Sequence, residues 1–108
     1  MIETGAEMAW HKVASKNELD DEEVIGVEVG DTQIAVYRLG EDFFATSNIC
    51  THAFAFLSDG YIEDECIECP LHQQLFKIST GEALEGPAEE DLKIFPVKLE
   101  GDDILVEV

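Results

Sequence analysis

The chain has 108 residues, the usual size of one folded domain, and its 45% hydrophobic content excludes a disordered acidic tail. It carries 25 acidic residues against 6 basic ones, for a formal net charge of -19. Because nucleic acid and anionic membranes both bind positive charge, this balance excludes them as partners and favours docking on basic patches of other proteins.

The first half of the chain predicts three β-strands after a loose leader of residues 1–8. We expect the core to begin at Trp10 and Val13, and residues 15–23 to form a polar loop with at most one helical turn. Two segments rich in β-branched residues at every second position then flank Gly30-Asp31, a pattern typical of a hairpin. The strands are expected over residues 24–29, 34–37 and 43–46.

The second half predicts further short strands, over residues 61–68, 75–78, 94–99 and 104–108. Pro96 cannot donate a hydrogen bond to a sheet, so its nitrogen should face an edge or a bulge. Many short strands joined by turns, with no internal repeat or linker, predict an all-β fold. We expect a small sandwich or barrel that forms a single domain over residues 1–108.

The sequence also indicates a compartment. No apolar run approaches the ~20 residues of a membrane span. The first residues are acidic and lack the features of a signal peptide. Three cysteines are an odd number, which argues against a disulfide framework. We therefore expect a soluble protein of the cytoplasm.

Two short motifs hold the candidate site: Cys50-Thr51-His52, the first ligand motif, and Cys69-Pro70-Leu71-His72, the second ligand motif. Sixteen residues separate them, enough for the chain to leave and return. Thiolate and imidazole bind zinc, copper and iron–sulfur centres rather than magnesium or calcium. Two sulfurs and two nitrogens could hold either one tetrahedral zinc or a [2Fe–2S] cluster of mixed ligation.

The order of ligands bears on that choice. Common Cys2His2 zinc sites pair Cys with Cys in one motif and His with His in the other, whereas each motif here has one of each. This arrangement lets one iron of a binuclear cluster take both cysteines and the other iron both histidines. A structural zinc domain that acts as an interaction module remains the alternative.

The two motifs resemble the cluster-binding loops of Rieske proteins, and Trp10, the strands before Cys50, the Thr80-Gly81 turn and Pro87 extend the resemblance over nearly the whole chain. The layout is similar to the small ferredoxin components of bacterial aromatic-ring dioxygenase systems. The resemblance implies a Rieske-like fold whose cluster-binding part is inserted between strands at about residues 48–88.

What the resemblance implies about the site is specific. Cys50 and Cys69 would bind the buried iron of one [2Fe–2S] cluster, and His52 and His72 would bind the outer iron near the surface. The chain would then be an electron carrier rather than an enzyme. It would take single electrons from an NAD(P)H-dependent flavin reductase and pass them to a terminal ring-hydroxylating oxygenase. A small subunit of a nitrite-reductase-type enzyme is a further alternative.

Several positions depart from the high-potential respiratory members of the family. Those proteins have a disulfide bond at the positions of Ala55 and Leu71 in this chain. They also have a Ser and a Tyr that donate hydrogen bonds to sulfur, and the matching positions here are Gln74 and Phe76. Fewer hydrogen bonds to sulfur stabilise the reduced cluster less, so we expect a low potential. Gln73 replaces a common Gly, which casts doubt on the loop conformation there.

Two neighbouring features allow two interpretations each. Cys66 forms a C-x-x-C pattern with Cys69, but residues three apart on a strand point to opposite faces, so we interpret Cys66 as a packed thiol rather than half of a redox pair. The apolar residues 53–57 follow His52 directly. Phe54 and Phe56 could form a docking collar around the histidines or cap the cluster against water.

Overall fold

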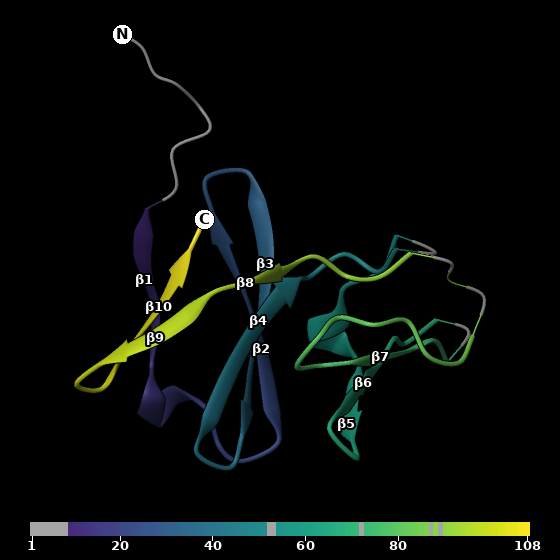
Figure 1. Ribbon diagram of the computed structural model, residues 1–108, viewed down its shortest axis with the longest axis horizontal. Helices are drawn as coiled ribbons and strands as arrows, with labels where there is room; N and C mark the ends of the chain where they lie inside the picture. The colour runs from purple at the N-terminus through teal and green to yellow at the C-terminus, as the bar shows by residue number, and fades with distance from the viewer. Residues whose placement is uncertain (1–8, 52–53, 72, 87, 89) are drawn as a thin grey trace, which may run out of the picture.

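The computed structural model describes residues 9–51, 54–71, 73–86, 88 and 90–108. Within these ranges the chain is nearly all β, as expected, with antiparallel pairing throughout. Three sheets lie side by side in Figure 1. One contains β1 (Trp10–Ser15), β10 (Asp103–Glu107) and β9 (Val97–Glu100). A second contains β2 (Glu23–Val29), β3 (Thr32–Leu39), β4 (Asp42–Ser47) and β8 (Ile94–Phe95).

The third sheet carries the second ligand motif. It contains β5 (Tyr61–Glu63), β6 (Cys66–Glu68) and β7 (Leu75–Lys77), preceded by the short 3-10 helix η2 (Leu57–Asp59). The expected strand over residues 61–68 is in fact two strands. Asp64 and Glu65 turn the chain between them with φ of 53° and 65°, in the left-handed region. A two-residue hairpin with a type I′ turn has positive φ at both central positions, which the sequence does not signal because neither residue is Gly or Asn.

Strand β3 separates two cores. Its central residues Ile34, Ala35, Val36 and Tyr37 are all fully buried. Because successive side chains on a strand point to opposite faces, the two sets serve different layers. Ala35 and Tyr37 pack in the core that contains Cys50 and Cys69, whereas Ile34 and Val36 pack with residues of β1 and β10. Cys50 and Cys69 therefore share a core with one face of β3, and the opposite face of this strand is packed as well.

Pro96 is the point at which the chain changes sheets. The expected strand over residues 94–99 is split there, because Pro96 has no N–H for a ladder. Before it, β8 pairs with β4, and after it, β9 pairs with β10. The Pro96 carbonyl still accepts a hydrogen bond from the Glu107 amide at 3.0 Å.

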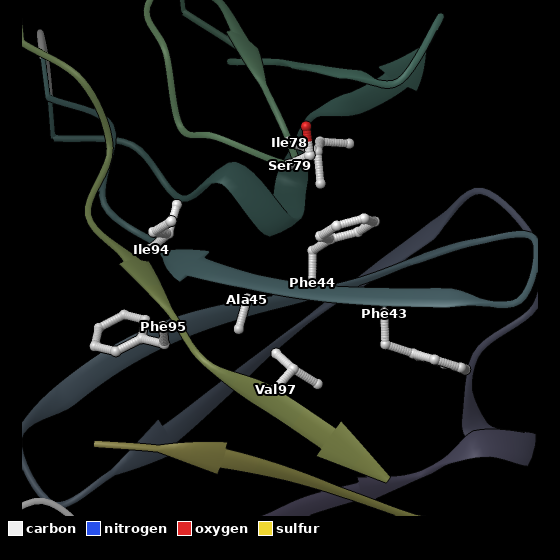
Figure 2. Close-up of a pocket in the computed structure, with 8 residues that line it drawn as sticks. All are labelled: Phe43, Phe44, Ala45, Ile78, Ser79, Ile94, Phe95 and Val97. Carbon is white, nitrogen blue, oxygen red and sulfur yellow. The ribbon is translucent and has the colours of Figure 1, made fainter.

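An apolar pocket of about 220 Å³ lies at this change of sheets. Figure 2 shows its lining side chains, which come from β4, from β8 and β9, and from the turn after β7: Phe43, Phe44, Ala45, Ile78, Ser79, Ile94, Phe95 and Val97. Neither Cys50 nor Cys69, the two predicted ligands that the structure describes, lines it. The pocket belongs to the packing between the sheets rather than to the candidate site.

The N-terminal expectations are partly wrong. Trp10 is exposed rather than the start of the core, and its ring lies 4.4 Å from Lys98 Nζ in a cation–π contact. Val13 does pack against the core, at its edge. The single expected helical turn is η1 (Lys16–Glu18), where the Ser15 amide donates to Glu18 Oε2 at 3.1 Å. The leader of residues 1–8 lies outside the described residues.

No helix in the described ranges is long and apolar enough to cross a membrane.

Candidate metal centre

The two cysteines of the ligand motifs begin turns of the same kind. The Cys50 amide donates to the Ala55 carbonyl at 2.9 Å, and the Cys69 amide donates to the Gln74 carbonyl at 2.8 Å. In each case the bond spans five residues, so each motif is held in a short closed loop. Cys50 follows β4 and Cys69 follows β6 directly, so rigid sheets present both loops.

Cys50 and Cys69 share one buried space. Both are buried, in a core with Tyr37, Ile67 and Phe76. The pKa of the Cys69 thiol is raised to about 11, chiefly by burial, with the backbone hydrogen bond of Leu71 offsetting part of the rise and the hydrogen bond and charge of the neighbouring Cys50 adding to it. Two adjacent thiolates in an apolar core need a compensating cation, so this pair fits a metal centre that binds both sulfurs.

His52 and His72, the other two predicted ligands, lie outside the described residues. The residues beside them are described. Phe54 is 82% exposed and Leu71 is 43% exposed. Gln73 is also exposed. The predicted position of the histidines near the surface stays a prediction, which these exposed neighbours favour.

A buried amide that the sequence analysis missed anchors the first motif. Asn48 lies two residues before Cys50, and its side chain makes two hydrogen bonds to Ser58: Nδ2 donates to Ser58 Oγ at 3.0 Å, and Oδ1 accepts from the Ser58 amide at 2.8 Å. Gly26 of β2 packs against this pair, since a Cβ there would lie 2.8 Å from Asn48 Nδ2. The only signal in the sequence was a polar residue between strand and motif.

A second buried amide lies beside the second motif. Gln74 is fully buried, with its Oε1 accepting from the Ala88 amide at 2.6 Å and its Nε2 donating to the Leu75 carbonyl at 2.9 Å. Thr51 of the first motif makes a comparable contact, because its hydroxyl donates to the Glu90 carbonyl at 2.7 Å. The sequence comparison singled out Gln74 only as a residue without the Ser hydroxyl.

The other departures are found as expected. Phe76 is fully buried and has no hydroxyl, and none of the three cysteines, all of which are described, forms a disulfide. Gln73 adopts φ +55°, so this non-Gly residue does occupy the left-handed region that the sequence made doubtful. Cys66 is half-buried on β6, and burial, followed by the charge of Asp64, raises its thiol pKa. A raised pKa disfavours a reactive thiolate, in keeping with a packed thiol.

Comparison with known proteins decides what the centre holds. The family model described as the Rieske [2Fe-2S] domain matches residues 9–96. The chain belongs to the Rieske [2Fe-2S] family. This confirms the predicted cofactor, one Rieske-type [2Fe–2S] cluster, and rejects the zinc alternative. The donor set fits, because the two buried thiols supply half of the mixed sulfur and nitrogen ligation that such a cluster requires.

Two relatives in the Rieske family align with nearly the whole length of this chain. The chain is 45% identical over 101 residues to the biphenyl 2,3-dioxygenase ferredoxin component of Rhodococcus jostii (strain RHA1), covering 94% of each chain. It is 38% identical over 99 residues to the naphthalene 1,2-dioxygenase ferredoxin component of Pseudomonas aeruginosa, covering 92% of this chain and 95% of the relative.

A solved structure agrees with these relatives. A complex of reduced oxygenase and oxidised ferredoxin in carbazole 1,9a-dioxygenase matches with a TM-score of 0.85 at 35% identity, covering 90% of this chain and 91% of the other. The prediction of an electron-carrying Rieske ferredoxin, rather than an enzyme, is confirmed by these likenesses.

Proposed function

We propose that this Rieske ferredoxin carries single electrons in the cytoplasm from an NAD(P)H-dependent flavin reductase to a terminal aromatic-ring-hydroxylating oxygenase. The observation that carries this proposal is the pair of buried thiols at the ends of β4 and β6, in a chain related to two ferredoxin components of dioxygenase systems. The carbazole system supplies a related ferredoxin bound to its oxygenase. When bound, the cluster supplies reversible one-electron reduction.

The proposal assigns each ligand. Cys50 and Cys69 would hold the inner iron, in keeping with their burial, and His52 and His72 would hold the outer iron, in keeping with the exposure of Phe54 and Leu71 beside them. One domain over residues 1–108 would carry the cluster within residues 48–88. The protein's own part is to bind the cluster, restrict water around the thiolates and present the outer iron to partners.

The docking surface would combine an apolar tip with an acidic surround. Phe54 is exposed, and its ring lies 5.9 Å from that of Phe56. Residues 48–88 contain one basic residue, Lys77. The acidic residues in this part are Asp59, Glu63, Asp64, Glu65, Glu68, Glu82 and Glu85. Such a surface fits a basic partner patch, through steering by charge and a small apolar contact.

Metal analysis and electron paramagnetic resonance (EPR) of the reduced protein test the ligand assignment. We expect two irons and two acid-labile sulfides per chain, and the spectrum of a cluster with mixed Cys and His ligands. Cys50→Ser and His72→Ala should abolish the cluster. The matched controls are the remaining cysteine and histidine: Cys66→Ser and His11→Gln should retain full iron content.

Two outcomes would contradict the proposal. Full iron content in Cys50→Ser or His72→Ala, or loss of iron in Cys66→Ser or His11→Gln, would reject the ligand set. Copurification with a large enzyme subunit as a permanent complex would reject the shuttle and favour the nitrite-reductase-type alternative.

We also propose a low potential. The side chains at the positions of the respiratory disulfide and tyrosine are Ala55, Leu71 and Phe76, and none of them can bridge or bond to a sulfur as those groups do. Protein-film voltammetry should give a value near the lower end of the Rieske range of roughly −150 to +300 mV. A value near the upper end would reject this part of the proposal.

A further inference from the structure

A groove of about 340 Å³ lies between the β2–β3 hairpin and the residues on either side of the first ligand motif. Its lining includes side chains or backbone from both parts of the chain, all within the described residues: Gly26, Glu28 and Gln33 from the hairpin, and Asn48, Phe56 and Ser58 from around the motif. The groove is separate from the apolar pocket at Pro96, because the two share no lining residue.

The wall formed by Asn48 and Ser58 is rigid. Asn48 is buried, and its side-chain amide makes hydrogen bonds of 3.0 Å and 2.8 Å to Ser58. The Asn48 backbone amide also donates to the Gln33 carbonyl at 3.0 Å, which ties this wall to the hairpin. The groove is therefore formed before any ligand enters it, which lowers the entropy that binding costs.

The opposite wall carries two polar side chains without partners. Glu28 and Gln33 are directly paired across β2 and β3, so their side chains leave the same face next to each other. Neither side chain takes part in a hydrogen bond or ion pair with any residue that the structure describes. Arg38, the only basic residue of the hairpin, pairs with Glu23 at the other end and donates to the Leu19 carbonyl at 2.9 Å. The negative charge of Glu28 is therefore uncompensated.

This combination of groups suits a guanidinium. The Glu28 carboxylate and the side-chain carbonyl of Gln33 are adjacent acceptors, which match the planar fork of N–H donors in arginine. Phe56 is 36% exposed and supplies an aromatic ring, on which a guanidinium stacks. A lysine ammonium is a compact point charge and gains less from two adjacent acceptors and a ring.

We infer that the groove binds an arginine side chain of the protein on which this ferredoxin docks, with Glu28 as its counter-charge. The groove continues the proposed docking surface, because the Phe56 ring lies 5.9 Å from the ring of the exposed Phe54. The net charge of -19 favours a basic partner surface. The identity of that partner rests on the proposed function, which makes it the terminal oxygenase.

Nuclear magnetic resonance titration of the holoprotein with N-acetylarginine amide tests the groove without a partner protein. At millimolar concentrations, this probe should shift the amide signals of Gly26, Glu28 and Gln33. N-acetylcitrulline amide has the same shape without the charge and should leave these signals unchanged, and N-acetyllysine amide should shift them less. Glu28→Gln should abolish the arginine shifts, whereas Phe56→Leu should remove the preference for arginine over lysine.

The matched control for Glu28 is Glu41, an exposed carboxylate in the turn at the opposite end of β3. Glu28→Lys should raise the KM of the partner oxygenase for the reduced ferredoxin about tenfold, and Glu28→Gln should raise it about threefold. Glu41→Lys makes the same change in net charge and should raise it no more than about twofold. Iron content should be unchanged in all three variants.

Three results separate the possible failures. Arginine shifts that spread evenly over the acidic surface, or that persist in Glu28→Gln, would overturn the inference. Shifts confined to the groove, together with an equal KM in Glu28→Lys and Glu41→Lys, would show that no partner arginine occupies it and would overturn the inference as well. An original protein that passes no electrons to the oxygenase would contradict the proposed function, and the titration would still decide whether the groove binds arginine.

Discussion

The hydroxyl groups of Tyr37 and Thr46 lie 2.8 Å apart between β3 and β4, and both residues are fully buried. Thr46 Oγ1 also lies 2.9 Å from the Ser47 carbonyl, to which it donates, so the Tyr37 phenol is the donor to Thr46. Tyr37 packs in the same core as Cys50 and Cys69. Burial raises the pKa of the Tyr37 phenol well above its ordinary value.

This raised pKa predicts a loss of stability in alkali. Because the folded protein holds the Tyr37 proton more tightly than the unfolded chain, its contribution to stability is complete below the unfolded pKa of about 10 and declines as the pH rises towards the folded value. Between about pH 9 and pH 11 the loss should be about 1.4 kcal/mol. Urea unfolding of the protein and of Tyr37→Phe over this range measures it.

Tyr37→Phe should cost about 1 kcal/mol at neutral pH, through the lost hydrogen bond, and should be less sensitive to alkali. Tyr61, the other tyrosine, is exposed on β5. Tyr61→Phe should therefore keep the full alkaline loss. Equal pH profiles for Tyr37→Phe and the original protein would contradict the prediction.

The backbone at Gln73 predicts a stabilising substitution. A φ of +55° costs a non-Gly residue about 1 kcal/mol, and Gln73→Gly should recover about that amount, less the entropy that glycine gains in the unfolded chain. Thermal unfolding of the holoprotein is the measurement. Gln33→Gly within β3 should instead be destabilising, and a similar loss at both positions would show that the left-handed turn carries no strain.

Gly60 precedes β5 at a point where no side chain fits. A Cβ at Gly60 would overlap the carbonyl oxygen of Glu68, the residue before Cys69. Gly60→Ala should lower the free energy of unfolding by more than about 2 kcal/mol and reduce iron content, since backbone must move next to a ligand. Gly40→Ala meets open space and strains only its positive φ, so its cost should stay near 1 kcal/mol with full iron content.

The exposed Phe54 ring predicts a docking defect. Phe54→Asp should raise the KM of the partner oxygenase for the reduced ferredoxin about tenfold and leave iron content unchanged, because it places a charge in an apolar contact. Leu99→Asp makes the same kind of change at an exposed position on β9, in the sheet formed with β1 and β10, and should leave this KM unchanged. Loss of iron in Phe54→Asp would instead assign Phe54 the capping role.

Much of the fold followed from local pattern. Alternation of β-branched residues gave the hairpin of β2 and β3, and turn residues gave the short strands after it. The pattern failed where tertiary pairing overrode it. Residues 94–99 form two strands because the chain changes sheets at Pro96. Asp64 and Glu65 form a turn without glycine because β6 pairs on both sides, with β5 and with β7.

The site divides in the same way. By itself, the sequence determined the chemistry: two motifs that each combine Cys with His select a soft metal centre, and their order favours a mixed-ligand cluster, because ligand type and spacing are local properties. Only the tertiary structure decided that Cys50 and Cys69 share one buried space, and that Asn48, Thr51 and Gln74 brace the loops around them. Those contacts join residues up to 39 positions apart, and no local pattern encodes such a pairing.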